Sequence, residues 1–187
     1  MSGAKIFLRR PQESDFRELA ELYNASREHL RGFASTLFDE TAFGRTLAEA
    51  ENDTYEYFLI CRNADTAIAG TINLSQIFRK SFQNAYLGYM LGANFTGFGY
   101  MSEAVALTLD FAFGQLKLHR VEANVQPVNL PSIRVLQRNN FTKEGFSRRY
   151  IKIGGRWRDH ERWAIIKEDW KPHEVNDLTS IKNTRIA

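Results

Sequence analysis

The sequence predicts an α/β fold of one domain, with a mixed central sheet and helices on both faces. Segments of strand and helix character follow in the order strand, two helices, three strands, helix, strand, helix, two strands, an order typical of a sheet covered by helices. The 187 residues, 43% hydrophobic and 25% charged, suit one domain with a substantial core. The chain shows no repeat, low-complexity tract or interdomain linker.

The N-terminal half supplies most of the sheet. KIFLR at 5–9 predicts a strand, and a helix follows from near Ser14 or Asp15, where Asp15 and Glu18 resemble a capping box. A second helical stretch covers 39–52. Three further strands are expected, the first two forming a hairpin, at 55–62, 66–77 and 83–92.

The C-terminal half alternates helices and strands. The apolar segment 100–114 predicts a buried helix that stops at Gly114, and 119–126 predicts a strand with Val121, Ala123 and Val125 on one face. Pro131 opens a short helix at 131–140. Two last strands, 145–153 and 156–166, flank the dipeptide Gly154–Gly155, which predicts a tight hairpin turn.

Composition indicates a cytoplasmic protein without membrane partner or metal. The N-terminus lacks an apolar segment of signal-peptide length, and nowhere do 18 apolar residues run together. One cysteine, Cys61, excludes an internal disulfide framework, and its place in a predicted strand favours a buried structural thiol. Four scattered histidines show no metal-ligand spacing, so we expect no metal site.

Positive charge gathers near the C-terminus. Between 143 and 167 there are eight Lys or Arg against three acids. Such a region can contact RNA or another polyanion, but strand residues that point their charges at water explain the same pattern and are the favoured interpretation.

The stretch GANFTGFGYMSEA at 92–104 indicates an anion site. Its glycines precede a predicted helix, whose first N–H groups lack helical partners and attract phosphate. A Walker A loop needs Lys after its last glycine, where Tyr100 stands, and a dinucleotide fingerprint needs glycine where Ser102 stands. An ordinary tight turn remains the alternative.

Four segments resemble one family in order and spacing: TGFGYMSEA, HRVEANV, NLPSIRVLQRNNFTKEGF and RYIKIGGRWRDH. Together they resemble the GNAT superfamily of acetyl-CoA-dependent N-acetyltransferases, in its ribosomal-protein N-terminal (alanine/serine) branch of RimJ/RimL type. Thr96 and Met101 depart from the family's glycine-loop pattern. The resemblance covers most of 4–170, which gives one catalytic domain, 1–170, and a polar tail, 171–187.

The resemblance implies a fold in which the fourth and fifth strands splay around acetyl-CoA. Backbone groups of Tyr89, Met90 and Leu91 would bind pantetheine, and Asn129 would reach the same arm, although a helix-capping role for Asn129 is equally open. The pyrophosphate would lie on the loop and first helical turn formed by Gly97, Phe98, Gly99, Tyr100, Met101 and Ser102.

The family's usual catalytic pair is missing. Many relatives carry Glu at the position of Asn124 and Tyr at the position of Leu136. The resemblance offers Ser132 as the group near the thiol, and Glu122 is the available carboxylate on the face of Asn124. A first-turn helix serine is an equally open interpretation of Ser132, and a solvated residue or an ion-pair partner of Arg120 or Arg134 is one of Glu122.

A site without a strong base favours an acceptor that is easily deprotonated. An α-amine, with a pKa of about 8, is neutral far more often at pH 7 than lysine, at about 10.4. We therefore expect transfer to a protein N-terminus, possibly of a ribosomal protein. The open alternatives are a small-molecule amine and a non-catalytic acyl-CoA-binding domain, and the chain can be a monomer or a homodimer.

The acceptor wall is expected between the N-terminal helices and the last hairpin. Its candidate residues are Phe33, Phe38, Tyr150, Trp157 and His160. Core packing is the favoured role for the aromatic residues. For His160, next to Asp159, a structural role is favoured over that of a base, because neighbouring strand residues point to opposite faces.

Overall fold

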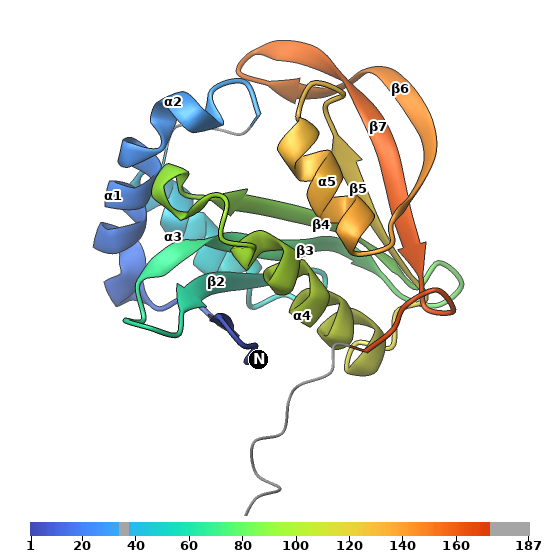
Figure 1. Ribbon diagram of the computed structural model, residues 1–187, viewed down its shortest axis with the longest axis horizontal. Coiled ribbons are helices and arrows are strands. Elements are labelled where there is room, and N and C mark those ends of the chain that lie inside the picture. The colour runs from blue at the N-terminus through green and yellow to red at the C-terminus, as the bar shows by residue number, and fades with distance from the viewer. Residues whose placement is uncertain (34–37, 173–187) are drawn as a thin grey trace, which may run out of the picture.

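The computed structural model describes residues 1–33 and 38–172, and it contains a mixed seven-stranded sheet (Figure 1). The strand order is β1-β2-β3-β4-β5-β7-β6, and only β4 and β5 pair in parallel. The strands are β1 (Ile6–Arg9), β2 (Glu56–Arg62), β3 (Ile68–Phe78), β4 (Asn84–Leu91), β5 (Arg120–Val125), β6 (Thr142–Ile153) and β7 (Arg156–Ile166).

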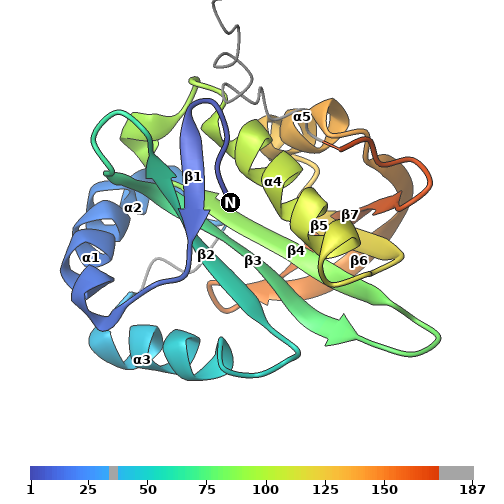
Figure 2. The same cartoon turned by 90° about the horizontal axis from the view of Figure 1, so that it is seen from below.

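Helices cover both faces of this sheet, so the predicted fold class is confirmed. Figure 2 shows α4 and α5 on one side and α1 and α3 on the other. The helices are α1 (Phe16–Ala25), α2 (Arg27–Leu30), α3 (Glu40–Glu49), α4 (Tyr100–Gly114) and α5 (Leu130–Arg138), with short 3₁₀ turns at Glu13–Asp15 and Ala93–Phe95.

Two details of the expected N-terminal helices were wrong. The four-residue helix α2 was not predicted, because so short a segment shows no periodicity. The helix expected over 39–52 ends at Glu49; it begins where the Asp39 carboxylate accepts a hydrogen bond from the Ala42 N–H.

The expected capping pair of Asp15 and Glu18 is also absent. The Asp15 carboxylate instead accepts two bonds of 2.7 Å from the Arg9 guanidinium and one from the Gln12 N–H. The bond from Arg9 lowers the pKa of Asp15. Glu18 accepts a bond from the Ile68 N–H, so both acids fasten α1 to neighbouring segments of the chain.

Two hydrophobic clusters fill the two faces of the sheet. The larger surrounds α4, which buries Val105, Ala112 and Phe113 against the strands. The smaller lies below α1 and α3 and contains Leu19, Leu59 and Cys61. Cys61 is fully buried, as expected of a structural thiol, and burial raises its pKa.

The C-terminal elements follow the sequence closely. Burial alternates along β5 as predicted, and Gly154 and Gly155 both have positive φ in the turn between β6 and β7. Trp170 packs on Phe113 and donates an indole N–H bond to Asp110, so the described chain ends against α4. The tail from 173 onward lies outside the described residues. Among the described helices, none is long and apolar enough to span a membrane.

The strands β4 and β5 separate soon after they meet. Their pairing joins only Asn84–Tyr86 to Arg120–Glu122. Beyond it, β4 continues on β3 to Leu91, while β5 continues on β7 to Val125. The two halves of the sheet therefore diverge at one end of this pair.

Leu59→Ala tests whether the smaller cluster is a true core. Leu59 is fully buried on β2, so its truncation should lower the free energy of unfolding by about 2–5 kcal/mol. The measurement is urea denaturation followed by circular dichroism. Leu130→Ala, at a residue that is 56% exposed, is the control and should change the midpoint little. Equal effects of the two changes would contradict this packing.

Candidate active site

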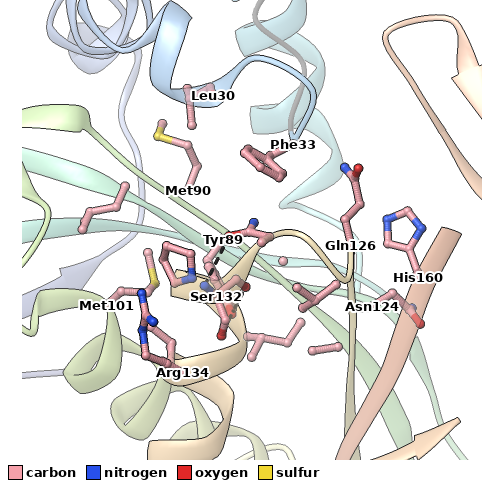
Figure 3. A pocket seen from close by; sticks show the side chains of 18 of the residues that line it. Leu30, Phe33, Tyr89, Met90, Met101, Asn124, Gln126, Ser132, Arg134 and His160 are labelled. Carbon is pink, nitrogen blue, oxygen red and sulfur yellow. Dashed lines mark hydrogen bonds between the residues drawn. The ribbon is translucent and has the colours of Figure 1, made fainter. Parts of the chain in front are cut away.

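A cavity of about 1050 Å³ occupies the space between the diverging strands (Figure 3). Its walls come from β4 (Tyr86–Leu91), β5 (Ala123–Val125) and the side of α5 that carries Ser132. One end reaches the start of α4, and the other reaches Phe33 after α2 and Tyr150 on β6. A long ligand can therefore extend from the α4 side of the sheet to the α2 side.

The loop before α4 exposes backbone N–H groups at the first end. Gly97 and Gly99 have φ of 87° and 84°, a left-handed conformation that suits glycine. The first helical bond runs from the Glu103 N–H to the Gly99 carbonyl, so the preceding N–H groups lack partners within the helix. Lys5 supports the loop through a bond of 3.0 Å from Nζ to the Phe98 carbonyl.

Ser102 adds an unused polar group at this end. Its Oγ is buried and has no hydrogen-bond partner within the described part of the chain, although the residue lines the cavity. A buried hydroxyl without a partner costs free energy unless a ligand satisfies it. The amides and this hydroxyl fit the diphosphate of a coenzyme A, and the cavity fits its pantetheine arm.

Phe98 is the one residue of the predicted phosphate loop that does not line the main cavity. It is 56% exposed, stacks on Tyr100 and borders a separate surface hollow. Gly97, Gly99, Tyr100, Met101 and Ser102 all line the main cavity. Only the backbone of Phe98 can therefore contribute to the phosphate end.

A hydrogen bond joins the two walls at mid-cavity. The Tyr89 Oη on β4 lies 2.7 Å from the Ser132 Oγ on α5. Burial raises the pKa of Tyr89 to about 12, so this phenol stays neutral. Asn129 is the N-cap of α5, and its side chain accepts a bond from the Ser132 N–H. This is the helix-capping role that the sequence left open. Asn129 also lines the cavity.

The two β5 polar candidates lie in different surroundings. Asn124 lines the cavity. Glu122 does not; its carboxylate accepts a bond of 2.8 Å from the Arg120 Nε and one of 3.4 Å from the Asn84 amide. Glu122 lies where β4 and β5 still pair, below the divergence. The expectation of Glu122 as an available carboxylate must be corrected, since it serves an ion pair.

Three of the five residues expected in the acceptor wall line the cavity. Phe33, Tyr150 and His160 line the far end of the cavity. Phe38 packs on Tyr23 and Phe16 below the sheet instead. Trp157 is 60% exposed near the tip of the last hairpin and is not in the cavity wall. The latter two are therefore removed from the acceptor wall.

Sequence reasoning missed several residues that shape the cavity. Gln126 donates a bond to the Gly32 carbonyl and so fastens the segment after α2 over the end of β5. Its place two residues after Asn124, on the same strand face, was a usable signal. Arg134 and Arg138, one helical turn apart on α5, also line the cavity, and spacing alone gave no sign of it.

Among the described residues, basic side chains line the cavity and acidic ones do not. No Asp or Glu lines it within the described part of the chain, whereas Arg134, Arg138, His29 and His160 do. Neither arginine takes part in an ion pair among the described residues. The described residues also contain no group of three or more His, Cys, Asp or Glu placed to hold a metal ion.

Splayed parallel strands, unpaired amides at a helix start and an anion-compatible cavity define a coenzyme A-dependent acyltransferase. The acetyltransferase (GNAT) domain model matches residues 5–142, and the chain belongs to this family. It is an N-acetyltransferase with acetyl-CoA as donor.

Proteins similar to this chain carry the names of acetyltransferases. A probable N-acetyltransferase, YjcK, from Bacillus subtilis is 38% identical over 177 residues, which cover 90% of this chain and 98% of the relative. The crystal structure of the ribosomal-protein-S5-alanine acetyltransferase from Vibrio fischeri has a TM-score of 0.81 and 30% identity, covering 92% of this chain and 98% of the other. Mycobacterium smegmatis RimJ in complex with CoA-disulfide has a TM-score of 0.79 and 27% identity, covering 88% and 87%.

Gly97→Ala tests the phosphate loop. A Cβ would meet no atom within 4 Å, but φ of 87° strains any residue other than glycine, by about 1–2 kcal/mol. We expect the dissociation constant for coenzyme A to rise about fivefold to thirtyfold in isothermal titration calorimetry. Gly114→Ala, equally open but without positive φ, is the matched control and should bind as the parent protein does. Unchanged binding by Gly97→Ala would remove the loop from the coenzyme site.

Proposed function

We propose that this acetyltransferase modifies the N-terminal α-amine of a protein, with ribosomal proteins as the leading class of acceptor. The observation that carries the proposal is the absence of any carboxylate among the described cavity residues. Without one, the site lacks a negatively charged group that binds a cationic amine. An α-amine, with a pKa of about 8, reaches the neutral form far more readily than a lysine, at about 10.4.

The two ends of the cavity give each substrate a separate entrance. The coenzyme extends from the α4 amides along β4, with Tyr89, Met90 and Leu91 beside pantetheine. The acceptor enters from the α2 side, past Phe33 and Tyr150. The substrates then meet at mid-cavity, near Ser132 and Asn124, which supports direct transfer in a ternary complex.

Ser132 is the proposed proton donor to the departing thiolate. When the neutral Tyr89 phenol donates its proton to the Ser132 Oγ, the proton of Ser132 is free to face the sulfur. Tyr89 thereby acts as a positioning residue. The position of Leu136, which holds a tyrosine in many relatives, cannot take this role, because Leu136 is an apolar side chain fully buried in the core.

A polyamine or another small cation fits this cavity less well. The acids near the N-terminal helices that could have formed an acidic cleft are Asp39, Glu40, Glu49 and Glu51, and none lines the cavity. Asp39 caps α3. The acceptor end of the described cavity therefore offers a polycation no carboxylate partner.

The last hairpin gives independent support for an acceptor bound to nucleic acid. All three acids between 143 and 167 already have partners: Glu144 pairs with Arg120, Glu161 with Lys143, and Asp159 accepts a bond from the Arg149 N–H. Several exposed cations of β6 and β7 form no ion pair within the described residues: Arg148, Arg149, Lys152 and Arg156. A ribosomal particle would complement this surface.

A panel of acceptors tests the substrate class. Thiol release should be fastest with peptides that begin with Ala or Ser and carry a free α-amine. The same peptides blocked by N-terminal acetylation, but containing lysine, should react at least tenfold more slowly, as should spermidine. Turnover of spermidine or of the blocked peptides at the higher rate would contradict the α-amine assignment.

Ser132→Ala tests the proton donor. Loss of the hydroxyl should lower kcat tenfold or more, equivalent to about 1.4 kcal/mol, with a smaller change in KM for acetyl-CoA. Ser81→Ala, in the exposed turn between β3 and β4, is the control and should leave kcat unchanged. A full rate from Ser132→Ala would remove this hydroxyl from the chemistry.

A further inference from the structure

His160 lies on β7 at the acceptor end of the cavity. The strand register pairs Asn124 with Arg162 and Val125 with Glu161, so His160 lies level with Gln126 beyond the last pair. Because cross-strand neighbours share a face, His160 shares the face of Asn124 and Gln126. Figure 3 shows these three side chains on the same side of Ser132, away from Met101 and Arg134 at the phosphate end.

His160 is buried from bulk solvent but borders the cavity. Only 2% of His160 is exposed, yet it forms part of the cavity wall. The Tyr150 ring covers it edge-on at 6.3 Å between ring centroids. The bond from Gln126 to the Gly32 carbonyl holds the α2 segment over the same end. The imidazole therefore faces an enclosed space, which an acceptor would share with it.

The hydrogen bonding of the ring fixes its tautomer. Nδ1 lies 3.0 Å from the Arg158 carbonyl oxygen. A carbonyl oxygen only accepts hydrogen bonds, so Nδ1 carries the proton. In the neutral ring Nε2 then holds the lone pair, and no partner of Nε2 is present among the described residues.

The surroundings keep this imidazole neutral. Burial lowers the pKa of His160 and outweighs the hydrogen bond to the Arg158 carbonyl and the nearby Asp159 carboxylate, both of which act to raise it. The other titratable or charged groups of the cavity are His29 from α2, Tyr86 and Tyr89 from β4, Tyr100 from α4, Arg134 and Arg138 from α5, and Tyr150 from β6, and those of the flanking β7 residues are Arg158, Asp159, Glu161 and Arg162. No carboxylate lines the described cavity, and Glu161 instead accepts bonds from Lys143 and the Trp163 indole.

We propose that His160 is the general base that takes the proton from the acceptor amine. In this step the amine nitrogen bonds to the acetyl carbonyl carbon, the carbon–sulfur bond breaks, and the proton lost by nitrogen passes to Nε2. The thiolate takes a proton from Ser132, which recovers one from water, and His160 releases its proton to solvent. The role rests on the proposed function only in requiring an amine acceptor at this end of the cavity.

Glu122 cannot take this role from its observed position. It lies outside the cavity and is bonded to Arg120 and Asn84. The resemblance implies a base at the level of Asn124 on β5. The neutral base is supplied by the neighbouring strand, one register step beyond the end of β5.

His160→Asn separates the chemical role from a structural one. The asparagine amide can still donate to the Arg158 carbonyl, but it has no basic nitrogen. We expect kcat to fall about 10²-fold to 10³-fold, within the range of general-base catalysis, while the affinity for coenzyme A stays within about twofold. His119→Asn, at a half-exposed histidine that pairs with Glu168, is the matched control and should retain the parent rate.

The pH profile of kcat/KM gives a second readout. A base works only when unprotonated, so activity is lost as the pH falls through the lowered pKa of His160, in addition to the loss from protonation of the amine. The acidic limb should therefore approach a slope of two in the parent protein and one in His160→Asn. The assay uses whichever amine the enzyme turns over fastest, so failure of the α-amine assignment leaves this test intact.

The parent protein alone suffices if the variant does not fold. With two acceptors whose amines differ in pKa, one acidic limb should shift with the acceptor and the other should stay, at a pH below about 6.5. The absence of an acceptor-independent limb would overturn the proposal. So would a folded His160→Asn protein with the parent rate and profile.

Discussion

The short parallel pairing of β4 and β5 is the constraint on which the site depends. Three residue pairs, up to Tyr86 and Glu122, hold the two halves of the sheet together, and beyond them each strand pairs only on its outer side. The backbone groups along the inner side of β4 are thereby left for a ligand. In the proposed reaction, the two substrates approach this divergence from opposite faces of the sheet and meet inside.

The chemistry of the cavity changes along its length in a way that suits acetyl transfer. Unpaired amides and the buried Ser102 hydroxyl lie at one end, where a diphosphate needs donors. A neutral tyrosine and a serine lie in the middle, and a neutral histidine at the other end. Since the described lining contains no carboxylate, the cavity suits an anionic coenzyme, and the proposed α-amine acceptor is one that loses its proton easily.

Local signals in the sequence determined most of the fold. The helix α4 was predicted to the residue at both ends, because an apolar run begins directly after Gly99 and stops at Gly114. The β6–β7 hairpin followed from Gly154 and Gly155. Long-range contacts could not be predicted. The ion pair of Glu122 depends on its neighbours across strands, Phe38 packs on residues of α1, and His160 is enclosed by β5, β6 and the α2 segment, which only the fold brings together.

The most direct test of this account is a crystal structure with coenzyme A and a peptide that begins with alanine. The account predicts the diphosphate on the amides between Gly97 and Ser102, the sulfur beside Ser132, and the peptide amine between that sulfur and His160. Coenzyme A bound outside the divergence of β4 and β5, or a peptide amine that enters from the α4 side, would contradict it.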